Sequence, residues 1–198
     1  MNEKTNNIAN RNPYTIWFVV LAFVAPAALA YFLYFFGNIG SFTNHGEILN
    51  PVVDIASLQL KDEKGELIPR KSITYKWRAI SFVDENCDEA CNSRLYDIRQ
   101  VHKSLAKNQH RVLRMIVHLQ VPSDALIKLI EQEYPNAINV FGDEKTISAA
   151  LGNSARVREN EIYLMDPMGN VMMRFTQDQP KKDLLKDLHK LLKASQIG

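Results

Sequence analysis

The sequence predicts an α/β domain behind one N-terminal transmembrane helix. From Thr15 to Phe36 there is no charged residue, and this run of about 22 residues is long enough to cross a hydrocarbon core of roughly 30 Å as a helix. From Lys76 onward, short apolar runs typical of strands alternate with segments whose apolar residues recur at helical spacing. The first pattern predicts the anchor, and the second predicts the domain.

The composition is that of a globular protein with room for one domain beyond the N-terminal segment. Of the 198 residues, 46% are hydrophobic and 23% are charged, and the formal net charge is +2. Lys4, Arg11 and Glu3 carry +1 of this charge, so the remainder of the chain is almost neutral. A near-neutral domain without a basic stripe is a poor candidate for binding nucleic acid.

The charges around the apolar run predict its orientation. Lys4 and Arg11 precede the run and no charge follows it until Glu47, so the positive-inside rule puts the short N-terminus in the cytoplasm. Cleavage after Ala30, at a signal-peptidase-like site, would leave the apolar Tyr31–Phe36 segment exposed, so we expect an uncleaved anchor. We therefore expect a cytoplasmic N-terminus, a transmembrane anchor, a tether and a domain, in that order, at residues 1–13, 14–36, 37–51 and 52–198.

The N-terminal segment also predicts the compartment in which the domain lies. The N-terminus lacks the Arg-rich, Ser-rich character of an organelle transit peptide, which favours a bacterial inner membrane with the domain in the periplasm. That compartment is oxidising, so a cysteine pair there needs a reductase partner if it is to act as a dithiol.

In the first half of the domain the patterns predict a hairpin, a strand and a helix. Ile55–Lys61 alternates and is followed by a turn signal and two apolar residues, which together suggest the hairpin. Lys76–Val83 predicts a buried strand that ends just before Cys87. After Cys91, apolar residues recur at helical spacing and predict an amphipathic helix to about Lys107.

The second half predicts alternating strands and helices. Val112–Val121 and Ala137–Phe141 are expected strands, a helix capped by Pro122-Ser123-Asp124 stops before Pro135, and Asp143–Leu151 predicts a short helix. A hairpin around the turn Asp166-Pro167-Met168-Gly169 and a final helix with a leucine stripe follow; the hairpin strands are Glu161–Met165 and Val171–Phe175, and the stripe is Leu184, Leu185, Leu188, Leu191 and Leu192. This element order is that of a thioredoxin-like fold with insertions.

The only two cysteines, Cys87 and Cys91, lie between the expected buried strand and the following helix. A helix start offers unpaired amides and the positive end of a dipole, which favour the thiolate, and the thiolate is both the nucleophile and the metal ligand. The alternative is a structural disulfide, because residues four apart on a helical turn meet the Cα separation that a bridge tolerates.

Four features of the sequence occur together: the anchor, the segment HGEILNP, the Cys-x3-Cys after a strand, and the hairpin sequence IYLMDPMGNVMMRF. In these features the chain resembles the Sco/SenC family of membrane-anchored cytochrome c oxidase assembly proteins. The resemblance implies a role in delivering copper to the dinuclear copper site of cytochrome c oxidase subunit II, or in reducing the cysteines of that site. Cys87 and Cys91 would then be copper ligands or a redox pair.

The chain departs from the family pattern at two positions. The proline that follows the first cysteine in the family is Asp88 here, and the distal histidine ligand falls near Arg158, where the segment reads NSARVRENEI without a histidine. His102 lies about 16 Å along the helix from Cys91, and His118 is expected to point to the opposite face of its strand from Val117. The remaining histidines and the methionines of the hairpin are weaker ligand candidates: His45, His110, His189, Met165, Met168, Met172 and Met173.

Three functions therefore stay open. The first is copper handling by two thiolates, since Cu(I) tolerates few ligands whereas structural zinc requires four. The second is thiol–disulfide exchange, with Cys87 attacking and Cys91 resolving, for this or another periplasmic client. The third is a non-catalytic assembly scaffold whose cysteines form an inert disulfide. A peroxidase is disfavoured, because the acidic neighbours of Cys87 would raise a thiol pKa.

Overall fold

A computed structural model describes residues 13–35, 44–152 and 160–197, and it divides the chain into a unit that ends at Thr43 and a compact unit from Asn44 to Gly198. The first unit contains the helix α1, Pro13–Phe35, which includes Pro26. Its stretch Tyr14–Phe35 has a mean hydropathy of 2.3 and exposed apolar side chains along its length. The predicted anchor is thus confirmed as a helix long and apolar enough to cross a membrane, while residues 1–12 and Phe36 lie outside the described part of the chain.

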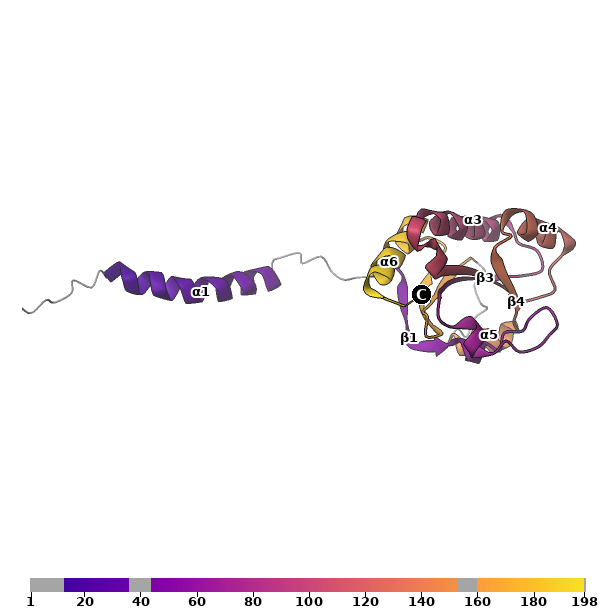
Figure 1. Cartoon of the computed structure of the whole chain (residues 1–198), viewed down its shortest axis with the longest axis horizontal. Coiled ribbons are helices and arrows are strands. Elements are labelled where there is room, and N and C mark those ends of the chain that lie inside the picture. The colour runs from indigo at the N-terminus through magenta and orange to yellow at the C-terminus, as the bar shows by residue number, and fades with distance from the viewer. Residues whose placement is uncertain (1–12, 36–43, 153–159, 198) are drawn as a thin grey trace, which may run out of the picture. The chain divides into compact units, whose positions relative to one another are not determined.

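The second unit is built on one mixed sheet with the strand order β1-β6-β5-β2-β3-β4 (Figure 1). The central strands β2, β3 and β4 run parallel, and β5, β6 and β1 are added by antiparallel pairing. The strands span Glu47–Asp54 (β1), Trp77–Val83 (β2), Val112–His118 (β3), Ala137–Phe141 (β4), Ile162–Met165 (β5) and Asn170–Phe175 (β6). All seven residues of β2 are buried, as expected of a central strand covered on both faces.

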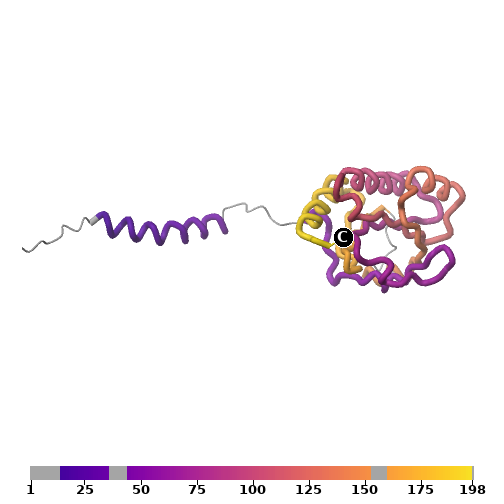
Figure 2. Tube along the Cα trace, viewed as in Figure 1, coloured from indigo at the N-terminus to yellow at the C-terminus, as the bar shows by residue number. Residues whose placement is uncertain are grey.

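Helices cover both faces of this sheet, as Figure 1 shows with α3 and α4 on one side and α5 on the other. Apolar residues of α3, α4 and α6 form the core on the first face, and η1, α2 and α5 pack on the second. The path of the chain through these layers can be followed in Figure 2. The helices span Arg70–Ile73 (α2), Glu89–Ser104 (α3), Asp124–Glu133 (α4), Glu144–Ala150 (α5) and Lys181–Ala194 (α6), with 3-10 turns at Ile55–Leu58 (η1) and Ala106–Arg111 (η2). This arrangement confirms the predicted thioredoxin-like α/β class.

Short polar side chains begin the helices where the sequence predicts. Ser123 accepts a hydrogen bond from the Leu126 amide and caps α4, and Asp143 caps α5 in the same way through the Thr146 amide. The predicted hairpin turn is also present: the Gly169 amide donates to the Asp166 carbonyl at 3.1 Å, and Gly169 takes a φ of +95°.

The predicted hairpin at residues 55–68 forms only around its turn. Ile55–Leu58 is the 3-10 turn η1 and is not a strand, whereas Lys61 pairs with Leu67 in an antiparallel bridge. The turn between them is present, with the Gly65 amide donating to the Asp62 carbonyl at 3.0 Å. The alternation of apolar and polar residues in Ile55–Lys61 has a different cause: Ile55, Leu58 and Leu60 are all buried in the core.

The expected tether overlaps the domain. Residues 47–51 belong to β1, which pairs with β6 at the edge of the sheet, and Glu47 forms an ion pair with Arg174 at 2.5 Å. The polar and proline-containing sequence of this segment resembled a linker because an edge strand tolerates such residues.

A buried carboxylate holds the entry to β1. Asp187 of α6 is fully buried and accepts hydrogen bonds from the amides of His45 (2.7 Å) and Gly46 (2.9 Å) and from Nδ1 of His45 (3.0 Å). The polar residue sits on the leucine-rich face of α6, between the buried Leu184 and Leu188. His45 is thereby part of the domain and is not in the tether, where the sequence had placed it.

Candidate functional site

The two cysteines join the end of β2 to the start of α3. Cys87 lies in the loop after Val83, and Cys91 lies in the first turn of α3; their Sγ atoms form a disulfide with a Cα–Cα distance of 5.3 Å. Cys91 is 1% exposed and packs with Val83 and Leu95, whereas Cys87 is half-buried. An external thiol would therefore reach Cys87 first.

Asp88, which stands where the resembled family has proline, is the N-cap of α3. Its Oδ1 accepts a hydrogen bond of 2.8 Å from the Cys91 amide. The Cys91 amide is one of the helix-start amides that were expected to stabilise a thiolate, and its hydrogen bond to Asp88 already occupies it. The carboxylate also places a negative charge between the two cysteines in sequence, which disfavours the thiolate relative to an uncharged cap.

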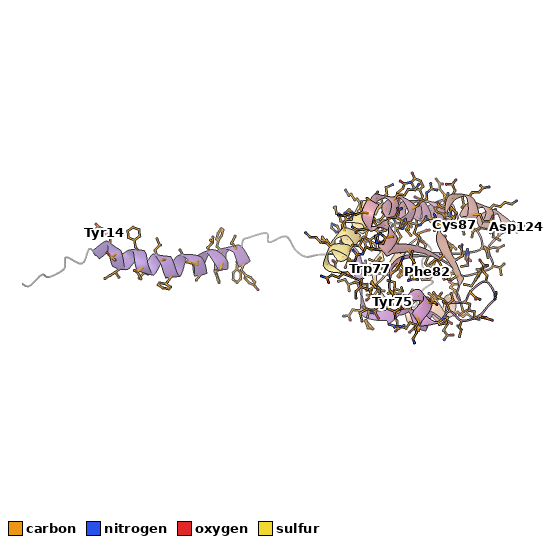
Figure 3. All side chains as sticks on the ribbon, in the orientation of Figure 1. Tyr14, Tyr75, Trp77, Phe82, Cys87 and Asp124 are labelled. Carbon is orange, nitrogen blue, oxygen red and sulfur yellow. A yellow bond between two sulfur atoms is a disulfide. The ribbon has the colours of Figure 1, made fainter. Side chains whose placement is uncertain are left out.

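The loop between β3 and α4 forms a neighbouring wall of the site. The Ser123 amide donates to the Glu85 carbonyl at 3.0 Å, and Figure 3 shows Cys87 and Asp124 at the same end of the domain. At the other end of α4, the Tyr134 hydroxyl donates to Oδ1 of Asn92 at 2.9 Å, next to Cys91. Burial raises the pKa of Tyr134, so the hydroxyl keeps its proton for this bond.

Arg94 is the residue of this region that the sequence analysis missed. It is 5% exposed and donates to the carbonyls of Asn160 (3.0 Å), Gln179 (3.1 Å) and Thr176. It thus ties the first turns of α3 to the chain just before β5 and just after β6. Its position in the helical pattern could have identified it, because Arg94 falls on the buried face of α3 together with Cys91, Leu95, Ile98 and Val101.

The structure does not bring the histidines to the cysteines as ligands. Among the described residues no group of three or more His, Cys, Asp or Glu side chains could hold a metal ion. His118 is 3% exposed, lies 3.2 Å through Nε2 from Oδ1 of Asn139, and stacks on Phe141. His102 is used by the backbone, since its Nε2 lies 2.8 Å from the Val112 carbonyl and 3.1 Å from the Gln109 carbonyl. Both rings therefore have structural contacts.

The other candidate ligands are also placed. His110 and His189 are exposed, and of the hairpin methionines Met165 and Met173 are fully buried in the core, Met172 packs against the core and Met168 is exposed at the turn. Arg158, at the distal-ligand position, lies outside the described residues. The described part of the site consequently contains two sulfur donors, and no third His, Cys, Asp or Glu ligand joins them there.

The buried histidines predict acid sensitivity. Burial lowers the pKa of both His118 and His102 below the ordinary value of 6.5, although hydrogen bonds oppose the shift. The unfolded chain therefore takes up protons first, so the stability is fully present above pH 6.5 and is lost as the pH falls through the folded-state pKa values. We expect a lower urea midpoint at pH 5.5 than at pH 7.5, and a smaller difference in His118→Gln. An equal difference in His118→Gln and the wild type would contradict this assignment, and the exposed His189→Gln is the matched control.

A mixed sheet covered by helices on both faces, with a cysteine pair between a central strand and the next helix, defines a thioredoxin-like domain. The chain belongs to the family described as the transmembrane-like, thioredoxin-like, C-terminal domain, whose model matches residues 77–195. No curated protein matches the chain in sequence.

Solved structures share this fold. Arabidopsis thaliana ScoI with copper bound is 15% identical, with 76% of this chain and 99% of that chain covered and a TM-score of 0.54. Yeast Sco1 is 16% identical, with 77% and 100% covered and a TM-score of 0.55. The MTB dsbF structure, in mixed oxidised and reduced forms, is 18% identical, with 69% and 97% covered and a TM-score of 0.50. The resemblance to Sco proteins is thus confirmed at the level of the fold.

Proposed function

We propose that this protein is a membrane-anchored, Sco-like assembly factor that exchanges thiols and disulfides through Cys87 and Cys91. The single observation that carries the proposal is the bridge itself, with a half-buried sulfur at the strand end and a buried sulfur in the first helical turn. This asymmetry gives the two cysteines different tasks. Its client is a bridged cysteine pair, and the resemblance points to the cysteines of the dinuclear copper site of cytochrome c oxidase subunit II.

The exchange runs from the reduced form. The Cys87 thiolate attacks one sulfur of the client disulfide, which forms a mixed disulfide and releases the other client sulfur as a thiolate that takes up a proton. The Cys91 thiol then loses its proton, and its thiolate attacks Sγ of Cys87 and frees the second client thiolate. Two electrons pass to the client, and this protein ends with the Cys87–Cys91 bridge found in the structure. A dithiol reductase must restore the reduced form.

Copper is the second candidate, as a cargo of the reduced pair. Structures of Arabidopsis thaliana and Bradyrhizobium japonicum ScoI contain copper, and both share this fold. Two thiolates suit Cu(I), which accepts low coordination numbers and soft ligands. Because the sequence has no histidine at the distal position, a partner would complete the coordination during transfer.

The anchor supports a location for this chemistry. With Lys4 and Arg11 in the cytoplasm and the domain outside, a bacterial inner membrane would place the cysteines in the periplasm. There the bridged form accumulates unless a reductase acts on it, and Cys87, the more exposed sulfur, is where that reductase would attack.

Two measurements on the full-length protein in uncharged detergent test the proposal. We expect the Cys87–Cys91 disulfide to have a reduction potential above about −300 mV, because structural disulfides typically have potentials below that value. After reduction, an anaerobic Cu(I) titration distinguishes the candidates: binding of one copper that is lost in both Cys87→Ser and Cys91→Ser would add copper handling. A potential well below that value together with no copper binding would leave an inert disulfide and a scaffold role.

A further inference from the structure

A polar pocket lies away from the cysteines, where α3 and η2 meet the end of α4. Its volume is about 260 Å³, and it is lined by Arg99, His102, Lys103, Gln109, Arg114, Gln132, Glu133, Pro135 and Asn136. A water takes about 30 Å³, so the pocket has room for a small hydrated ligand. Neither cysteine lines it.

Arg114 is the unusual member of this lining. It lies on the central strand β3 and is only 8% exposed, and neither its Nε nor its Nη1 has a hydrogen-bond partner among the described residues. Burial and, to a lesser extent, the positive charge of Arg99 lower the pKa of Arg114, and the Tyr134 side chain opposes this shift. A buried cation without a counter-charge is costly, and an anion in the adjoining pocket would offset that cost.

The neighbouring side chains do not supply a counter-charge for Arg114. Glu133 is the only carboxylate in the lining, and its Oε2 already accepts a bond of 2.6 Å from Arg99. Lys103 adds a further cation at the rim. His102 adds none while it is neutral, with Nε2 donating to carbonyls and Nδ1 accepting from the Gln109 amide at 3.2 Å. Three cations therefore face one carboxylate.

We propose that this pocket binds a small oxyanion of the phosphate class. Arginine and lysine around a polar pocket suit phosphate oxygens, and the side-chain amides of Gln109, Gln132 and Asn136 offer further donors. A cation would be repelled by Arg114 and Lys103, and an apolar ligand would leave Arg114 without a partner. The anion could be free in solution or be the headgroup of an anionic lipid, since both present the same oxygens.

The test uses the full-length protein in uncharged detergent at constant ionic strength. Inorganic phosphate is titrated by calorimetry, and a parallel arm adds phosphatidylglycerol to the micelles. The variants are Arg114→Met, which removes the buried charge, and Lys103→Met at the rim. Lys128→Met on the exposed face of α4 is the matched control for a lost positive charge. Circular dichroism checks that each variant is folded.

We expect phosphate binding that is at least about tenfold weaker in Arg114→Met, reduced to a lesser extent in Lys103→Met, and unchanged in Lys128→Met. A response to the lipid alone, lost in Arg114→Met, would support the site and identify the headgroup as its ligand. No response to either, or a response of equal size in Arg114→Met and the wild type, would overturn the proposal. Phosphate also stabilises proteins through exclusion from their surface, but that effect is common to all variants.

Discussion

Cys91→Ser is expected to trap a mixed disulfide that the wild type releases. In this variant the Cys87 thiolate can still attack a client disulfide, but no second thiol is present to break the resulting bond. Incubation of the reduced full-length variant with a synthetic peptide carrying two bridged cysteines should therefore give a stable one-to-one adduct. The adduct is measured by mass spectrometry after the remaining thiols are alkylated.

The companion variant assigns the roles of the two sulfurs. Cys87→Ser keeps only the buried Cys91, which is 1% exposed, so we expect little adduct. Ser93→Ala, at an exposed position of α3, should behave as the wild type and release reduced peptide. Equal trapping in Cys87→Ser and Cys91→Ser would show that exposure does not decide which sulfur attacks, and trapping in neither would argue for an inert disulfide.

The sequence was most informative where burial sets the pattern. The strand β2 is buried along its whole length, so its mostly apolar sequence, WRAISFV, was visible without any knowledge of its neighbours. The strand β4 was predicted with its observed bounds, and the cap of α4 within Pro122-Ser123-Asp124 was visible because capping depends on local sequence. The position of the cysteine pair followed from these elements.

The features that the sequence did not reveal depend on contacts between distant segments. β1 is a strand because β6 lies beside it, and its own sequence, EILNPVVD, contains Asn and Pro. Asp187 and Arg94 are buried polar residues that each bind a backbone group more than sixty residues away in sequence. In helical patterns both fall on the buried face, where a charged residue signals a fixed partner without identifying it.

The same reasoning applies to the chemistry of the site. The acidic residues around Cys87 were read from the sequence as a local charge, but Asp88 has a defined structural task as the N-cap that receives the Cys91 amide. The sequence placed His118 on the opposite face of β3 from Val117, and the structure adds that it is buried against Asn139 and Phe141. Neither contact could be derived from spacing, because each joins residues from different elements or depends on the loop conformation.

Arg94→Met is expected to destabilise the oxidised protein by about 2–4 kcal/mol. The substitution keeps an apolar stem in the buried stripe of α3 but removes the donors to the carbonyls of Asn160, Thr176 and Gln179, and a buried acceptor left without its donor costs roughly 1–3 kcal/mol. The free energy of unfolding is measured in urea with the disulfide intact. Arg94→Lys should recover only part of the loss, because one ammonium cannot replace a planar guanidinium that serves three carbonyls.

The matched control is Arg70→Met. The Arg70 side chain is 44% exposed, and it pairs with Asp54 and donates to the Met168 carbonyl at the surface, where an ion pair contributes about 0–1 kcal/mol. If Arg94→Met cost no more than Arg70→Met, the three carbonyls would be satisfied by water, and α3 would not depend on Arg94 for its attachment to the chain around β5 and β6. The larger cost that we expect would instead show that Arg94 fixes α3, the helix that carries Cys91, to the half of the sheet that contains β5 and β6. Arg94→Met should then also slow the exchange measured with the bridged peptide.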